Sequence, residues 1–376
     1  MIITTLRKIV LFFTLGFFVI SAVTHALAAS PALVKAKEDA EAKGYIFFTS
    51  HDEIVAIAKK EGRLKVSSGL EPPNFNPLIA AFKQKYPFIT EIYIEGIPGI
   101  DAQRKFILEM KSGQTKGWDI THIPIDLANE YMPFLMKHDI LGMAKQSVLK
   151  IDPRMVHPGE RNILSYTTTL HIVAYNRKLI SEDKLPAKWE DFLKPEFKGK
   201  KFVLDLRPNA VASLVPAWGL ERTLDFARKL AAQEPVWGRA PTRITTAIAA
   251  GEYSLSLAPN FNATKKVMSK DPTGNLSYKL IEPVPTRVVD HTSAILKTAD
   301  HPHAALLWME FLASPEGQEI IDKYEPLRAS AFSPGSAVAQ LIRGKELSVV
   351  DWDHFTKLQE YEAKILAAYG FPAADR

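Results

Sequence analysis

A strand-like segment near the middle of the chain, 166–176, separates two stretches that each alternate short strands with helices. Its sequence, YTTTLHIVAYN, alternates Thr and Tyr with apolar residues and is rich in β-branched types, which indicates a strand. Since one domain commonly takes ~100–200 residues, a chain of 376 residues is long enough for two. We therefore interpret this segment as a crossing between two lobes that bind a small ligand between them.

The stretch before this segment predicts an α/β lobe. Ser50 can cap a helix over 52–61, which has acidic residues in its first turn and ends at Gly62. Further strands and helices are expected, in chain order, at 63–67, 76–86, 88–94, 101–111 and from 118 onward. Strands that alternate with helices of about ten residues are typical of βαβ units and a largely parallel sheet.

The stretch after the segment predicts a second α/β unit and a return to the first. Strands are expected at 201–205 and 253–257, and helices at 210–218, 221–233 and 242–250. A second crossing is expected at 284–292, followed by helices over 301–313, 315–323 and one longer helix over 350–369. Lobe 1 would then comprise 29–170 and 291–376, and lobe 2 would comprise 171–290.

The N-terminal segment 1–28 is typical of a secretory signal peptide. Arg7 and Lys8 precede an apolar run over 9–23, and Ala26-Leu27-Ala28 is a small-x-small cleavage site. A membrane anchor is the alternative, but a spanning helix needs ~20 apolar residues and this run is shorter. We expect cleavage after Ala28 or Ala29 and a periplasmic location.

Composition excludes several classes of site. The chain has no cysteine, which excludes thiolate zinc sites, iron–sulfur clusters and cysteine nucleophiles. Of the 47 basic residues two lie in the N-terminal segment, which leaves 45 against 42 acidic residues. That balance does not provide the concentrated basic charge of a nucleic-acid-binding protein.

Several short motifs occur in a characteristic order behind the N-terminal segment. They are AKKEG at 58–62 before a strand that ends in Ser67-Ser68, LIAAF with Tyr86-Pro87, AYN at 174–176, KWEDF with PEFKGK at 188–200, AAGE at 249–252, and HPHAA with SPEGQ at 301–318. Together they resemble type II periplasmic solute-binding proteins of ABC importers, a branch that includes ferric-ion, thiamine, polyamine and phosphorylated-solute binders. The resemblance covers nearly all of the remaining chain.

This resemblance implies a fold, partners and a mechanism. The fold would be a two-lobe α/β fold of the periplasmic-binding-protein type II class, with two crossover strands and an interlobe cleft. The partners would be a small-molecule solute and an inner-membrane ABC permease with its ATPase, and the protein would act as a monomer without a cofactor. The solute would be captured by hinge closure.

Candidate ligand-binding residues lie where strands end or where the chain crosses between lobes. They are Ser67, Ser68, Glu71, Asn74 and His122 in the first lobe, Arg207, Asn209, Arg239, Arg243, Asn260 and Asn262 in the second, and Thr167, Thr169 and His291 in the crossings. In a strand of period 2, Thr167, Thr169 and His171 share one face. The forked donors of arginine suit a phosphate or carboxylate, although Arg207 could instead form a surface ion pair with Asp205 or Glu221.

An anionic solute is therefore the favoured ligand, and other functions remain as alternatives. Ferric-binding relatives use adjacent tyrosines with a histidine and a carboxylate, and this sequence has no Tyr-Tyr pair. No metal site is predicted, although a ferric-ion-binding protein of the same fold stays open. The sequence has no G-x-S-x-G, H-E-x-x-H, P-loop or dinucleotide fingerprint, so no enzyme is predicted. An exported hydrolase and a periplasmic sensor for a membrane receptor are the remaining alternatives.

Overall fold

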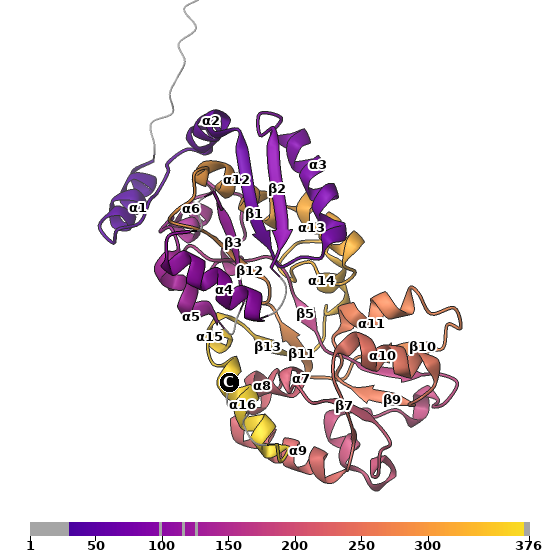
Figure 1. The fold of residues 1–376 in the computed structure, drawn as a ribbon. Coiled ribbons are helices and arrows are strands. Elements are labelled where there is room, and N and C mark those ends of the chain that lie inside the picture. Colours follow the sequence, from indigo (N-terminus) through magenta and orange to yellow (C-terminus); the bar gives the residue numbers. More distant parts are fainter. Residues whose placement is uncertain (1–29, 98–99, 115–116, 125–126, 372–376) are drawn as a thin grey trace, which may run out of the picture.

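The computed structural model describes residues 30–97, 100–114, 117–124 and 127–371. The signal peptide predicted for 1–28 lies outside these residues. The described chain forms two five-stranded sheets joined by a smaller three-stranded sheet (Figure 1). The fold class expected from the sequence, a two-lobe α/β fold, is confirmed. Among the described residues, no helix combines the length and the apolar character needed to span a bilayer.

The first sheet has the strand order β2-β1-β3-β12-β4. Its strands are β1 (Arg63–Ser68), β2 (Glu91–Gly96), β3 (Ile120–Ile123), β4 (Leu164–Ser165) and β12 (Thr292–Ile295). Strand β1 is parallel to β2 and β3, but β12 is antiparallel to β3 and β4. The sheet is thus mixed, because β12 returns from the second lobe. The helices of this part are α1 (Pro31–Glu41), α2 (His51–Glu61), α3 (Phe75–Lys85), α4 (Ile100–Lys111), α5 (Ala128–Tyr131), α6 (Ile140–Lys145), α12 (Pro302–Ala313) and α13 (Pro315–Tyr324).

The second sheet has the strand order β10-β6-β9-β7-β8. Its strands are β6 (Val173–Asn176), β7 (Val203–Asp205), β8 (Val236–Gly238), β9 (Leu255–Leu257) and β10 (Leu276–Lys279). Strand β7 is parallel to β8 and β9, so their carboxyl ends lie at the same edge of the sheet. Its helices are α7 (Asn209–Ala212), α8 (Val215–Trp218), α9 (Leu220–Ala232), α10 (Pro241–Ala250) and α11 (Phe261–Met268). The single helix expected over 210–218 is thus two short helices.

The small sheet connects the lobes and contains β5 (Thr169–Leu170), β11 (Val284–Arg287) and β13 (Leu347–Val350) in the order β13-β11-β5. The expected strand over 166–176 is therefore two strands, β5 and β6. They differ because β5 pairs with β11 in the connecting sheet, whereas β6 pairs with β9 and β10 in the second sheet. Short 3-10 helices lie at Pro72–Asn74, Met132–Phe134, Pro153–Met155, Glu182–Lys184, Trp189–Leu193 and Pro195–Phe197.

The C-terminal segment differs from the single helix expected over 350–369. After α14 (Ala337–Leu341) and β13, it forms α15 (Trp352–Phe355) and α16 (Leu358–Ala368). Leu358, Ile365 and Tyr369 belong to the apolar cluster that packs the second sheet, where α16 contacts α9 and α7. Helix α16 thus packs against the second lobe, because its apolar side chains complete a cluster with Phe226 and Leu230 of α9. Trp352 of α15 instead contacts the first lobe, where its indole N–H donates to the Arg154 carbonyl at 3.1 Å.

Local sequence signals account well for the helix that enters the first lobe. The Ser50 hydroxyl accepts a hydrogen bond from the Asp52 N–H at 3.1 Å, and Gly62 ends α2 with φ of 67°. The buried helix α12 packs against α2, and its Trp308 meets Phe82 of α3 edge-on, with ring centroids 5.0 Å apart. These contacts pack α2, α3 and α12 together in the first lobe.

Candidate functional site

A cavity of about 160 Å³ lies where the connecting sheet meets the carboxyl ends of β7 and β9. Its walls come from the turn after β7, the turn after β9, the strand β5 with the residues that follow it, the end of β11, and Tyr369, which directly follows α16. Turns at the carboxyl ends of parallel strands are a common place for ligands in α/β proteins. The volume is below the ~300–1,000 Å³ of pockets for drug-sized ligands, so the cavity suits a small solute.

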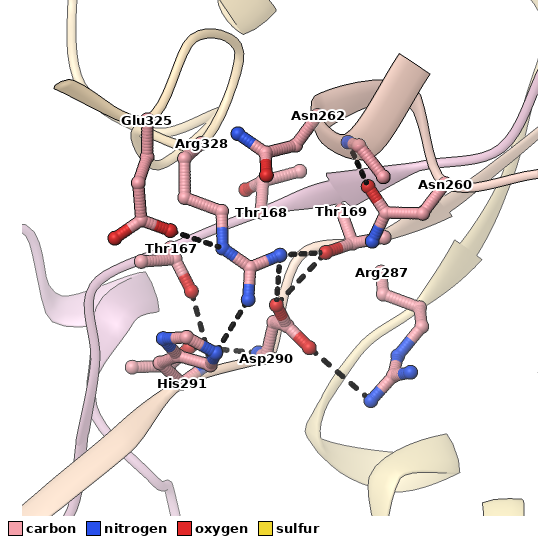
Figure 2. Close-up of polar contacts among 12 residues, drawn as sticks. Thr167, Thr168, Thr169, Asn260, Asn262, Arg287, Asp290, His291, Glu325 and Arg328 are labelled. Atoms are coloured by element: carbon pink, nitrogen blue, oxygen red, sulfur yellow. Dashed lines mark hydrogen bonds and ion pairs between the residues drawn. The ribbon is translucent and has the colours of Figure 1, made fainter. Parts of the chain in front are cut away.

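One carboxylate at this cavity, Asp290, holds two arginines (Figure 2). Its Oδ2 lies 2.8 Å from Nη1 of Arg328, and its Oδ1 lies 3.3 Å from Nη2 of Arg287. Burial by itself would raise the pKa of Asp290, but the charges of Arg328 and Arg287 hold it far below its ordinary value. The carboxylate is therefore ionised, and a single negative charge faces two positive ones.

Arg328 also forms hydrogen bonds to both crossings between the lobes, at Thr169 and at His291. It donates hydrogen bonds to the Thr169 hydroxyl and to Nε2 of His291, and the Thr169 hydroxyl donates to Asp290 at 2.8 Å. Because an arginine only donates, His291 must accept at Nε2 and carry its proton on Nδ1. Burial and the charge of Arg328 lower the pKa of His291 well below its usual value, so this ring is neutral. Thr167 supports it, since its hydroxyl accepts a hydrogen bond from the His291 N–H at 2.9 Å.

Four of the predicted site residues line the cavity: Thr169, Arg207, Asn209 and Asn260. Arg207 pairs with Asp205 through Nη2 at 2.9 Å while remaining half-exposed. It therefore lines the cavity and also forms the surface ion pair. The side chain of Asn260 caps α11 by accepting a hydrogen bond from the Ala263 N–H at 3.3 Å.

The other predicted residues of the second lobe lie outside this lining. Asn262 is directed toward the first lobe, where its amide donates to the Pro326 carbonyl at 2.8 Å. Arg239 and Arg243 are exposed on either side of Pro241, which itself lines the cavity. These two arginines therefore flank the site.

The predicted residues of the first lobe form a separate polar cluster. The amide of Asn74 and the N–H of Glu71 each donate to the buried Glu325 at 2.7 Å. The carboxylate of Glu71 forms an ion pair with Lys266 of α11, which links the two lobes. Burial raises the pKa of Glu325, which also lies 3.9 Å from Nε of Arg328.

The remaining predicted residues lie at the ends of β1 and β3. His122 donates from Nδ1 to the Thr292 carbonyl at 3.1 Å, and its ring packs edge-on against His291 at 5.3 Å. Burial lowers the pKa of His122 to about 4. The hydroxyl of Ser68 accepts from the Leu70 N–H, while the hydroxyl of the buried Ser67 has no hydrogen-bond partner among the described residues. His122 thus reaches the Arg328 network through His291.

Sequence reasoning missed Arg287, Arg328 and Tyr369 as site residues. Arg287 lies within the predicted second crossing, three residues before Asp290, so its position was available as a signal. Arg328 lies in an irregular segment after α13, and Tyr369 follows the last helix, so neither has a local pattern that points to a ligand. In the described part of the chain, no group of three or more His, Cys, Asp or Glu side chains is placed to hold a metal ion.

Comparisons with known structures identify the fold. It is similar to iron-bound HitA from Pseudomonas aeruginosa, with a TM-score of 0.62 and 19% identity over 81% of this chain and 99% of that chain. It is similar to ferric iron-binding protein A from Mannheimia haemolytica in an open conformation, with a TM-score of 0.64, 18% identity, and 83% and 99% coverage. Trichodesmium IdiA (FutA) in complex with iron and citrate gives a TM-score of 0.63 at 18% identity, with 82% and 99% coverage.

Comparison of sequences identifies the family. No curated protein matches this chain. The sequence model of the bacterial extracellular solute-binding proteins matches residues 127–358, which include both crossings and the whole second sheet. The match spans well over half of the chain and confirms the resemblance stated above. The chain belongs to the family of bacterial extracellular solute-binding proteins.

Proposed function

We propose that this protein captures a small anionic solute in the cavity at the connecting sheet and delivers it to an inner-membrane ABC permease with its ATPase. It would do so as a monomer in the periplasm, after removal of the signal peptide, and it would release the solute chemically unchanged. The observation that carries the proposal is the convergence of Arg207, Arg287 and Arg328 on one small cavity.

The charges at this cavity favour an anion. Asp290 offers one negative charge to Arg287 and Arg328, and each guanidinium has five N–H donors. The Nε atoms of both arginines have no hydrogen-bond partner among the described residues. Phosphate and carboxylate oxygens accept from such donors in pairs, which makes these hydrogen bonds strong and oriented.

Arg207→Ala is expected to weaken binding of the solute by ~1.5–3 kcal/mol, the scale of a hydrogen bond to a charged group. The solute is first identified by native mass spectrometry of protein purified from the periplasm, and its affinity is then measured by calorimetry. Arg222→Ala is the matched control, because Arg222 is equally exposed and pairs with Glu190 at 2.6 Å but lies outside the cavity lining. Equal affinities for the two variants would remove Arg207 from the site.

Hinge closure is expected to contract the particle. The two lobes are joined by the connecting sheet, and a solute that touches both lobes stabilises a closed arrangement. Small-angle scattering with the identified solute should show a smaller radius of gyration than protein alone. An unchanged radius at saturating solute would contradict closure on binding.

Ferric ion is the second candidate, because iron is present in the similar structures of HitA and IdiA (FutA). Against it, the chain has no adjacent tyrosines, and the three arginines that line the cavity outnumber its two carboxylates, Asp205 and Asp290, so the net charge there repels a bare cation. Equilibrium dialysis against ferric ion distinguishes the two. One tightly retained iron per chain would favour the iron-binding alternative over the anionic solute.

A further inference from the structure

Four buried polar side-chain atoms of residues that line the cavity have no hydrogen-bond partner among the described residues. One of them, Nε of Arg328, lies 3.9 Å from the carboxylate of Glu325. The other three are Nε2 of His171, Nε of Arg287 and the hydroxyl of Tyr369. Their exposed fractions are only 5%, 8% and 5%. Buried polar side-chain atoms nearly always have a partner in folded proteins, so three such atoms around one cavity point to a ligand that supplies the partners.

The tautomer of His171 makes its free nitrogen an acceptor. Its Nδ1 lies 3.2 Å from the carbonyl oxygen of Ala258, which can only accept, so the proton is on Nδ1. Burial and the nearby Arg287 lower the pKa of His171 to about 3, so the ring is neutral at neutral pH. Nε2 therefore carries a lone pair and requires an N–H or O–H from the ligand.

The other two atoms are donors. Nε of Arg287 always carries a proton, and burial, followed by the charge of Asp205, raises the pKa of the Tyr369 phenol, which keeps its proton. Two donors and one acceptor thus belong to residues that line the same small cavity. A plain carboxylate or phosphate would satisfy the donors and leave the lone pair of His171 without a partner.

The charges around the cavity distinguish an ammonium group from a hydroxyl group as the donor to His171. The carboxylate of Asp290 is engaged by Arg287, Arg328 and Thr169, and that of Asp205 is engaged by Arg207. No carboxylate at the cavity is left free to pair with an ammonium group, and Arg287 would repel one beside His171. A neutral hydroxyl group avoids this repulsion.

We propose, on the basis of the function proposed above, that the solute is a small acid bearing a hydroxyl group. Its anionic oxygens accept from Arg287 and Tyr369, and its hydroxyl donates to Nε2 of His171. Phosphate and carboxylate share this chemistry, so the test includes both anions.

The test is calorimetry of the full chain with two matched pairs of probes, lactate with propionate and glycerol 2-phosphate with isopropyl phosphate. Within at least one pair the hydroxylated probe should bind ~10- to 100-fold more tightly, the range expected when a buried acceptor is left unsatisfied. Anion binding without this preference overturns the inference and leaves the proposed function standing. Absence of binding by all four probes overturns both.

Variants test whether His171 causes the preference for the hydroxylated probe. His171→Phe should abolish it, and His171→Gln, which retains an acceptor, should keep part of it, while thermal melts confirm that both variants fold. Tyr369→Phe should weaken both members of a pair equally, by ~5- to 10-fold. Tyr361→Phe, in the helix that directly precedes Tyr369 but outside the cavity lining, is the control and should bind normally. A preference that survives His171→Phe would overturn the assignment.

Discussion

Replacing Asp290 with asparagine is expected to lower the free energy of unfolding by about 3–5 kcal/mol, the range measured when one partner of a buried ion pair is removed. The side chains of Asp290 and its partners Arg287 and Arg328 are at most 10% exposed. Asparagine has nearly the same shape, so packing is preserved while two buried positive charges lose their counter-charge. Urea denaturation at neutral pH measures the change.

Asp205→Asn is the control for this prediction. Asp205 also holds an arginine, but Arg207 is 55% exposed, and water can solvate its charge when the partner is removed. Exposed pairs contribute roughly 0–1 kcal/mol, so this variant should lose at most about 1 kcal/mol. If the free energy of unfolding falls equally in both variants, burial does not explain the contribution of the Asp290 ion pairs to stability.

Acidification from pH 6.5 to about 4.5 is expected to destabilise the protein by several kcal/mol. Burial lowers the pKa of His122 and His138 from 6.5 to about 4 and that of His171 to about 3. The unfolded chain therefore binds protons in this window that the folded protein does not, and stability falls as the pH falls. Each such histidine contributes up to about 1.4 kcal/mol per pH unit.

His138 is the residue on which to test this expectation, because it lies in the first lobe beside Ile46 and Phe48, away from the cavity, and its Nδ1 has no partner among the described residues. His138→Phe should reduce the slope of unfolding free energy against pH by close to one proton between pH 6.5 and 4.5. Urea titrations at several pH values give the slope. An unchanged slope would show that His138 is protonated in the folded protein.

His51 provides a control of opposite sign. Its hydrogen bond to Glu310 raises its pKa, so it contributes stability that is present below pH 6.5 and is lost as the pH rises. His51→Gln should therefore lower the free energy of unfolding by a nearly constant amount below pH 6.5 and leave the slope of the acid loss almost unchanged. Carboxylates with lowered pKa, such as Glu310 and Glu61, lose their contribution only at lower pH, outside the window.

The sequence predicted those parts of the site that lie at the ends of regular elements. Arg207 and Asn209 follow β7, Asn260 follows β9, and all three line the cavity. The end of a strand is visible in the local pattern of apolar residues, and the family's architecture directs such ends toward the cleft. Arg239 and Arg243 obeyed the same rule but only flank the cavity, because local pattern does not give side-chain direction.

Local sequence determined the alternation of strands and helices, the caps at Ser50 and Gly62 and the existence of two crossings, because each depends on residues within a few positions of one another. Only the tertiary structure decided which side chains meet at the cavity. Thr169 bonds to Asp290 across 121 residues of chain and to Arg328 across 159. Sheet pairing sets such contacts, and the place of α16 depends on its packing against α9 and α7, which lie far earlier in the chain.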